Sequence, residues 1–314
     1  DLRQAKLTST IKRVRIWTDR EGASPVADLK DLLAEGGLAG LRVGVEWDTH
    51  GLVAHHGMRL AVALDGFVTV TDASRLVAQL RLVKSEAELA YVRRAAELAD
   101  AALEAAIAHT APGADEAVIL ARMQNRVFEG GGDYPANPFI IGSGPMALLC
   151  RYHTGRRRLD ADAQLTLEFA GVYRQYHACL MRTLLVGAVD DEQRRMFDLA
   201  RDALLACEER LKPGRTLGEV YQAHADTFDK AGMAEHRLNA CGYSLGATFA
   251  PSWMDWPMIF AGNPVEVRPG MVLFLHMILM NSETGRAMTL GRTSIVGESG
   301  PEPLSKAPLE LVVR

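Results

Sequence analysis

Two ionisable residues lie inside apolar stretches that predict buried strands. Glu168 stands in Gln164-Leu-Thr-Leu-Glu-Phe-Ala, and His276 stands in Met271-Val-Leu-Phe-Leu-His-Met-Ile-Leu-Met. Burying a carboxylate or an imidazole without a partner is unfavourable, and two such groups facing one cavity acquire pKa values suited to acid–base or nucleophilic catalysis. We therefore predict that they form a catalytic pair. The structural alternatives are a core histidine bonded to the backbone and a glutamate paired with an arginine.

A repeat in the chain predicts how these two residues are positioned. Two motifs occur twice, the Pro-Gly turns of His109-Thr-Ala-Pro-Gly and Arg210-Leu-Lys-Pro-Gly and the Arg-Thr pairs at Arg182 and Arg292, which are 110 residues apart. Glu168 and His276 are 108 residues apart, so they should occupy matching places in two halves. In each half, the sequence predicts two helices followed by antiparallel strands. The expected fold class is α+β, with one curved antiparallel sheet, helices on its outer face and a site in the concavity.

The residues before the repeat predict a smaller N-terminal domain. Residues 41–46 and 67–71 have the β-branched character of strands, and residues 52–64 are suited to a helix. Ser85 and Glu88 have the spacing of a capping box, so a long helix should run from Glu86 to about Thr110. We place the boundary near Lys84, which gives domains of residues 1–83 and 84–314.

Composition limits the classes of partner. The 314 residues carry a net charge of −4, which does not favour nucleic acid or a membrane surface as a partner. No apolar run reaches the length of a transmembrane helix. None of the four cysteines forms a Cys-x-x-Cys pair, so we expect reduced thiols and a cytoplasmic location.

Two further segments carry a resemblance to a known superfamily. Leu80-Arg-Leu-Val-Lys-Ser-Glu-Ala-Glu-Leu and Tyr173-Arg-Gln-Tyr-His-Ala-Cys-Leu-Met-Arg-Thr, together with the repeat, resemble methionine aminopeptidase, prolidase, aminopeptidase P and creatinase. The resemblance implies a pita-bread fold of two pseudo-symmetric halves, over about residues 41–314. It also implies a homodimer, and it makes residues 1–83 short for the usual N-terminal domain, so we expect that domain to be incomplete.

The resemblance also indicates which positions would bind metal. The five positions that hold two Asp, one His and two Glu in the metallopeptidases hold Glu168, Cys179, Tyr243, His276 and Gly291. This set is too poor in carboxylates for a manganese or cobalt pair. We therefore expect no cofactor and a metal-independent enzyme. A zinc ion held by Glu168, Cys179 and His276 is the minority alternative.

The metal-free branch of the superfamily suggests the catalytic roles. His153 resembles the catalytic histidine of creatinase, and the segments around Glu168, Tyr243 and His276 resemble ectoine hydrolase, in which the glutamate is thought to attack the substrate. By this resemblance Glu168 is the nucleophile or the general base, and His276 or His153 moves the proton to the leaving nitrogen. Tyr243 would donate a hydrogen bond to developing charge.

Other polar and aromatic residues are candidates for substrate binding. An arginine would hold a substrate carboxylate, and two tryptophans would form a wall for a cationic or zwitterionic ligand. The candidates are Arg151, Tyr173, His177, Arg182, Trp253, Trp256 and Arg292. The structural alternatives are arginines that orient strands and tryptophans that pack within a loop.

The function predicted from the sequence is the metal-independent hydrolysis of a C–N bond. The substrate would be a small amidine, guanidine or amide. Two alternatives remain open at this point: a metal-dependent Xaa-Pro dipeptidase or aminopeptidase, and an inactive peptidase homologue that serves as a binding module.

Overall fold

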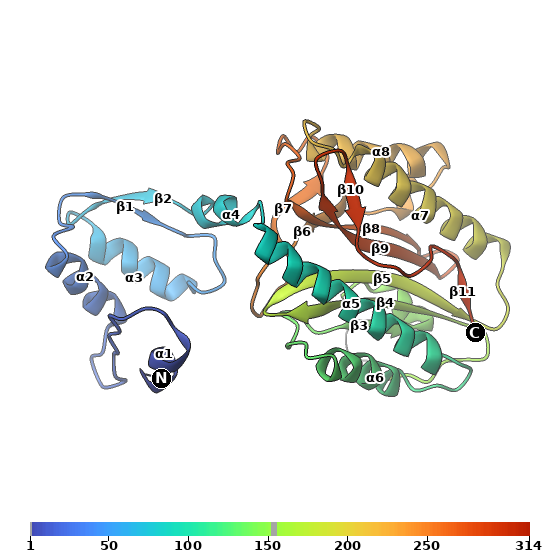
Figure 1. Ribbon diagram of the computed structural model, residues 1–314, viewed down its shortest axis with the longest axis horizontal. Coiled ribbons are helices and arrows are strands. Elements are labelled where there is room, and N and C mark those ends of the chain that lie inside the picture. The colour runs from blue at the N-terminus through green and yellow to red at the C-terminus, as the bar shows by residue number, and fades with distance from the viewer. Residues whose placement is uncertain (1, 152–155) are drawn as a thin grey trace. The chain divides into compact units, whose positions relative to one another are not determined.

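The protein forms two compact units in the computed structural model (Figure 1). The structure describes residues 2–151 and 156–314. The units are Asp1–Val77 and Ala78–Arg314, so the chain divides a few residues before Lys84, where the sequence placed the boundary.

The first unit is a small α/β structure. It contains α1 (Leu2–Thr8), α2 (Pro25–Glu35), β1 (Arg42–Val45), α3 (Ala54–Leu64) and β2 (Thr69–Asp72), and α4 (Leu76–Arg81) spans the boundary. The strands β1 and β2 pair in parallel, and Val26, Leu60 and Leu64 form the buried core. The two predicted strands and the predicted helix are all present.

The second unit is built on one large sheet. Its helices are α5 (Glu86–His109), α6 (Glu116–Glu129), α7 (Asp191–Arg210) and α8 (Leu217–Lys230), with short helices η1 (Gly144–Leu148) and η2 (Ala234–His236). Its strands are β3 (Ile140–Ser143), β4 (Ala163–Tyr173), β5 (Tyr176–Val186), β6 (Ala240–Ser244), β7 (Asp255–Phe260), β8 (Val272–Asn281), β9 (Arg286–Val296), β10 (Pro301–Pro303) and β11 (Val312–Val313). Within the described residues, the main path of the sheet runs β3-β4-β5-β9-β8-β6-β7.

The two predicted halves meet at the centre of this sheet. The hairpin β4–β5 belongs to the first half and β8–β9 to the second, and β5 pairs with β9. The helices α5 and α6 pack together in the first half, and α7 and α8 pack together in the second (Figure 1). This arrangement confirms the α+β class.

Local sequence explains where the long helices begin. Ser85 and Glu88 form the predicted capping box before α5, and the same reciprocal bonds precede α7 and α8 at Asp190 and Thr216. Helix α5 approaches β4 closely because Gly171 lacks a side chain; a Cβ there would lie 1.9 Å from the carbonyl oxygen of Ala95. The face of β4 that carries Gly171 therefore packs against the helices. Glu168 is three residues earlier, so its side chain projects from the opposite face.

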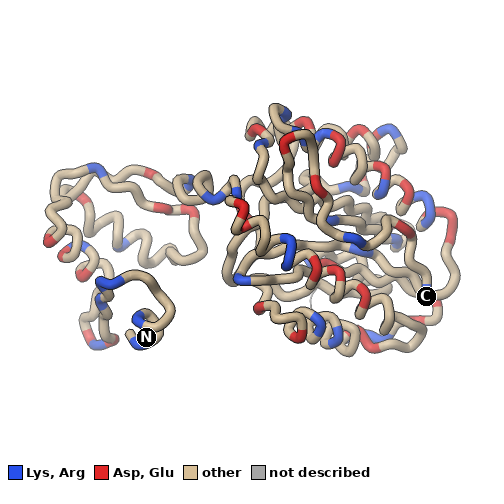
Figure 2. Tube along the Cα trace, viewed as in Figure 1, with Lys and Arg blue, Asp and Glu red and all other residues tan. Residues whose placement is uncertain are grey.

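Charge on the outer helices is mixed in sign. Figure 2 shows basic and acidic residues interspersed along α6 and α7. This distribution agrees with the small net charge of −4. Among the helices of the described residues, none has the length and apolar character needed to cross a membrane.

Candidate active site

Four residues form a row across the central strands. Glu168 pairs with Met181, Met181 pairs with Gly291, and Gly291 pairs with His276. Directly opposed residues of antiparallel strands project from the same face of a sheet. The structure thus places Glu168 and His276 on one face, with the two strands β5 and β9 between them, in matching places of the two halves as the repeat predicted. Gly291 contributes no side chain between them, and a Cβ there would lie 3.0 Å from the ring of Phe274.

This face forms the floor of a small cavity. The cavity has a volume of about 200 Å³ and brings together Glu168, His276, Tyr243, Arg151 and Trp253, all of which the sequence singled out. The remaining lining residues are mostly apolar: Asn137, Ile140, Cys150, Leu238, Ala240, Ser252, Met254, Met258 and Ile278. Pockets for drug-sized ligands measure roughly 300–1,000 Å³, so this cavity is suited to a smaller molecule.

Two hydrogen bonds connect the carboxylate to the cavity wall. The hydroxyl of Tyr243 donates to Glu168 Oε1 at 2.8 Å, and Trp253 Nε1 donates to Tyr243 Oη at 2.9 Å. The ring of Tyr243 packs against Phe274 and His276, with centroid distances of 5.3 and 5.7 Å. Tyr243 is therefore held both by its ring and by its hydroxyl.

Burial dominates the electrostatics of the site. It raises the pKa of Glu168 to about 7, while the bond from Tyr243 and the charge of Arg151 act in the opposite direction. Burial lowers the pKa of His276 to about 4, and Arg151 adds to that effect. At neutral pH the site therefore contains a neutral imidazole and a carboxyl group close to its titration midpoint.

An irregularity in β6 directs Tyr243 into the cavity. The register between β6 and β7 shifts between Ala240 and Gly242. As a result, Ala240 and Tyr243 both line the cavity, whereas Cys241 belongs to the core cluster around α7 and α8. Shifts of this kind re-aim side chains near functional sites.

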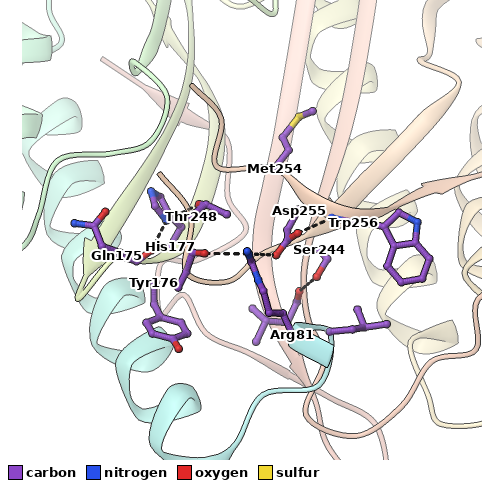
Figure 3. Close-up of polar contacts among 12 residues, drawn as sticks. Arg81, Gln175, Tyr176, His177, Ser244, Thr248, Met254, Asp255 and Trp256 are labelled. Carbon is purple, nitrogen blue, oxygen red and sulfur yellow. Dashed lines mark hydrogen bonds and ion pairs between the residues drawn. The ribbon is translucent and has the colours of Figure 1, made fainter. Parts of the chain in front are cut away.

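The loop that carries Trp253 and Met254 is anchored at several points (Figure 3). Arg81 Nη2 donates to Asp255 Oδ2 at 2.5 Å and to the carbonyl oxygen of Ala247 at 2.9 Å. The Thr248 hydroxyl lies 3.2 Å from His177 Nδ1, and the backbone N–H of Thr248 donates to the carbonyl of Gln175. These contacts fix the loop on both sides of Trp253.

Five predicted binding residues do not line the cavity. Arg292 forms two bonds of 2.7 Å to Glu208, and Arg182 donates to the carbonyl oxygens of Met181 and Gly291. These contacts match the structural alternative, in which the arginines orient strands. Trp256 packs against the core cluster around α7 and α8, and the ring of Tyr173 packs at a tilt against the ring of Tyr91.

His177 is held as a neutral imidazole behind the same loop. The backbone N–H of Ala136 donates to its Nε2 at 3.0 Å, so its Nδ1 carries the proton and donates to the carbonyl of Gln175 at 2.9 Å. Burial lowers the pKa of His177 to about 4. This residue shapes the loop and does not reach the cavity lining. The remaining predicted residue, His153, lies outside the described residues.

Sequence reasoning missed most of the apolar wall. Ile278 is the wall residue that the sequence could have identified. It lies two residues after His276 and therefore projects from the same face of β8. Leu238, Met254 and Met258 come from loop or edge segments far from Glu168 in the chain. No periodic signal marks such residues.

Comparison with known proteins shows the family. Residues 90–298 match the model of metallopeptidase family M24. This chain belongs to metallopeptidase family M24. The match spans more than half of the chain and covers both halves of the sheet. It confirms the expected superfamily and, at the level of the family, an enzyme that hydrolyses C–N bonds.

Individual relatives agree with this assignment. The chain is 31% identical over 254 residues to the Uncharacterized hydrolase/peptidase y4tL of Sinorhizobium fredii. The aligned region covers 78% of this chain and 62% of that relative. It is 24% identical to the Xaa-Pro dipeptidase of Pyrococcus furiosus, over 76% of this chain and 67% of the relative. A solved prolidase from Thermococcus sibiricus matches with a TM-score of 0.88 at 18% identity, covering 100% of this chain and 83% of the other. This likeness confirms the pita-bread fold.

The family corrects the expectation about cofactors. We expected no cofactor, and this was wrong because family M24 is a family of metallopeptidases. The residue types at five positions were too narrow a basis for excluding a metal. Among residues 2–151 and 156–314, however, no three His, Cys, Asp or Glu side chains are grouped so that they could hold a metal ion. The donors among the described residues thus do not fit a metal pair.

Proposed function

We propose that this chain hydrolyses the C–N bond of a small amide of the dipeptide class. The observation that carries the proposal is a buried carboxylate, Glu168, which lies on the floor of a cavity of about 200 Å³ and accepts a hydrogen bond from Tyr243. Membership of a peptidase family and the names of relatives such as the Xaa-Pro dipeptidase support the same reaction class.

Glu168 has the properties of a group that moves a proton at neutral pH. Hydrolysis forms a bond from water oxygen to the carbonyl carbon, breaks the C–N bond and transfers one proton from water to the leaving nitrogen. A general acid–base group works best when its pKa is near the working pH, and the pKa of Glu168 is about 7. We assign to Glu168 the role of accepting that proton and passing it to the nitrogen.

Arg151 supports a substrate that carries a carboxylate. It lines the same cavity, and its positive charge acts to lower the pKa of both Glu168 and His276. A guanidinium pairs well with a carboxylate, such as the C-terminus of a dipeptide. The apolar side chains around it, including Met254 and Ile278, are suited to an uncharged body of small size.

A small amidine or guanidine is the second candidate substrate. The observation that favours it is the aromatic wall formed by Tyr243 and Trp253, since an aromatic face attracts a cationic group. This is the substrate class that creatinase and ectoine hydrolase suggested.

A homodimer and a cytoplasmic location also stay predictions.

A substrate screen tests the proposal. Purified protein is incubated with Ala-Pro, other dipeptides, creatine and ectoine, each with and without added Mn²⁺, Co²⁺ or Zn²⁺, and the released amine is measured. We expect turnover of a dipeptide, and its loss by about a hundredfold or more in Glu168→Gln. The matched control, Glu104→Gln on the exposed side of α5, should keep full turnover.

Two outcomes would contradict the proposal. Full turnover by Glu168→Gln would remove Glu168 from the reaction. Calorimetric binding of Ala-Pro without turnover under every metal condition would favour the alternative of a binding module.

A further inference from the structure

The contact between Trp253 and Tyr243 has a fixed direction. An indole Nε1–H can only donate a hydrogen bond, so Tyr243 Oη accepts at the 2.9 Å contact with Trp253. In its ionised form the Glu168 carboxylate can only accept, so the 2.8 Å contact at Oε1 then uses the single hydroxyl proton of Tyr243. Hydrogen bonds arranged head to tail in this way polarise and strengthen one another.

Burial protects this chain of bonds from competing water. The exposed fraction of Trp253 is 2% and that of Tyr243 is 3%. The indole belongs to a loop that the pair Arg81–Asp255 holds on one side. Both the donor and the acceptor of the first bond are thus fixed by packing, which is the condition for precise placement of a hydroxyl proton.

We propose that Trp253 is a positioning residue, which directs the hydroxyl proton of Tyr243 onto Glu168. The inference rests on the proposed role of Glu168 in catalysis. Trp253 acts through Tyr243: by occupying one side of Oη it holds the hydroxyl toward Glu168 and favours the ionised carboxylate that accepts a proton from water. The loop after β6 thereby contributes to the chemistry on β4, 85 residues earlier in the chain.

The indole N–H resonance of Trp253 tests this arrangement without any substrate. The chain has four tryptophans, so an ¹⁵N-labelled sample gives four indole signals, and Trp253→Phe identifies the one of interest. We expect Glu168→Gln to shift this signal, because a neutral amide polarises Tyr243 less than a carboxylate does. In a Tyr243→Phe background, Glu168→Gln should leave it unchanged. The signals of Trp17 and Trp47 are internal controls.

Two results would overturn the inference. A Trp253 signal that does not respond to Glu168→Gln shows that the two residues are not connected. An equal response with and without the Tyr243 hydroxyl shows that the connection does not pass through Tyr243. A Trp253 whose role is packing alone produces one of these two results.

Kinetics provides the second readout on the dipeptide Ala-Pro. Loss of one neutral hydrogen bond should lower kcat in Trp253→Phe by roughly three- to tenfold with little change in KM. The double variant with Tyr243→Phe should be no slower than Tyr243→Phe alone, whereas multiplied losses would contradict a role through Tyr243. Failure of the proposed function is distinguishable, because it appears as undiminished turnover in Glu168→Gln while the indole signal still reports on the contact.

Discussion

At the scale of single residues, the candidate site depends on one carboxyl group and its surroundings. Burial raises the pKa of Glu168 to about 7, and Tyr243 and Arg151 limit that rise. His276, whose pKa burial lowers to about 4, stays neutral in the same cavity. Among the described residues, His276 Nδ1 has no hydrogen-bond partner, so this imidazole retains donor or acceptor capacity.

Tyr243→Phe should move the acidic limb of the rate profile to higher pH. Removing the hydroxyl deletes the hydrogen bond that lowers the pKa of Glu168, so the pKa rises further above its ordinary value. If Glu168 must be ionised to accept a proton, kcat/KM for Ala-Pro should reach half its maximum at a higher pH in the variant. A limb that stays in place or moves to lower pH would contradict this assignment.

At the scale of elements, the strands β4, β5, β9 and β8 determine the floor of the cavity through their register. One position in that row must lack a side chain, because a Cβ on Gly291 would lie 2.7 Å from the carbonyl oxygen of Leu275 and 3.1 Å from Cα of His276. These are backbone atoms of the neighbouring strand β8, which cannot rotate away. The closeness of β8 and β9 at this point therefore depends on glycine.

Gly291→Ala should destabilise the second unit by about 1–3 kcal/mol, because β8 and β9 must separate to admit a methyl group. The measurement is urea unfolding followed by circular dichroism. Gly51→Ala is the control, since its nearest neighbour would be 3.9 Å away, an ordinary contact distance. Unchanged stability in Gly291→Ala would show that the strands are not as closely paired as described.

At the scale of the whole molecule, the second unit buries several titratable groups. Burial lowers the pKa of His177 and His276 to about 4 and that of His224 to about 3. His224 is fully buried, and neither of its ring nitrogens has a hydrogen-bond partner within the described part of the chain. Each histidine binds a proton in the unfolded chain at a pH where the folded chain does not.

This difference predicts loss of stability on mild acidification. A lowered histidine pKa contributes stability that is present above about 6.5 and is lost as the pH falls toward about 4. Glu168 opposes this, since its pKa of about 7 exceeds the ordinary 4.5 and its contribution is lost as pH rises. The three histidines and Glu168 thus act in opposite directions, with a net difference of two protons between the folded and unfolded chain. The free energy of unfolding therefore changes by at most about 2.7 kcal/mol per pH unit.

His224→Leu should weaken this dependence by roughly 1.4 kcal/mol per pH unit between pH 6.5 and 4, because one of the three protons is removed. Unfolding free energies from urea titrations at several pH values measure the slope. His56→Asn is the control, since His56 is exposed in the folded chain. A slope in His224→Leu as steep as that of the original chain would refute the assignment.

The sequence by itself determined the class of fold, and it predicted the two residues at the centre of the candidate site. Caps and apolar periodicity are local signals, so Ser85 and Glu88 predicted the start of α5, and the lone ionisable residues of two apolar strands predicted that Glu168 and His276 would face one cavity. Tertiary structure decided the rest. The side chains of Arg182 and Arg292 point away from the cavity because each follows an inward-facing position, a choice that depends on register.

The cavity wall and its hydrogen bonds also required the tertiary structure. Trp253 reaches Tyr243 only because a loop anchored to Arg81 and Thr248 brings it there, and such long-range contacts leave no periodic trace in the chain. The residue types at the metal positions led to a wrong expectation about cofactors, because they were read without the evidence that the chain belongs to a metallopeptidase family. Local patterns thus indicated which segments form buried strands and helices, while strand register, strand pairing and loop placement decided which residues meet in the cavity.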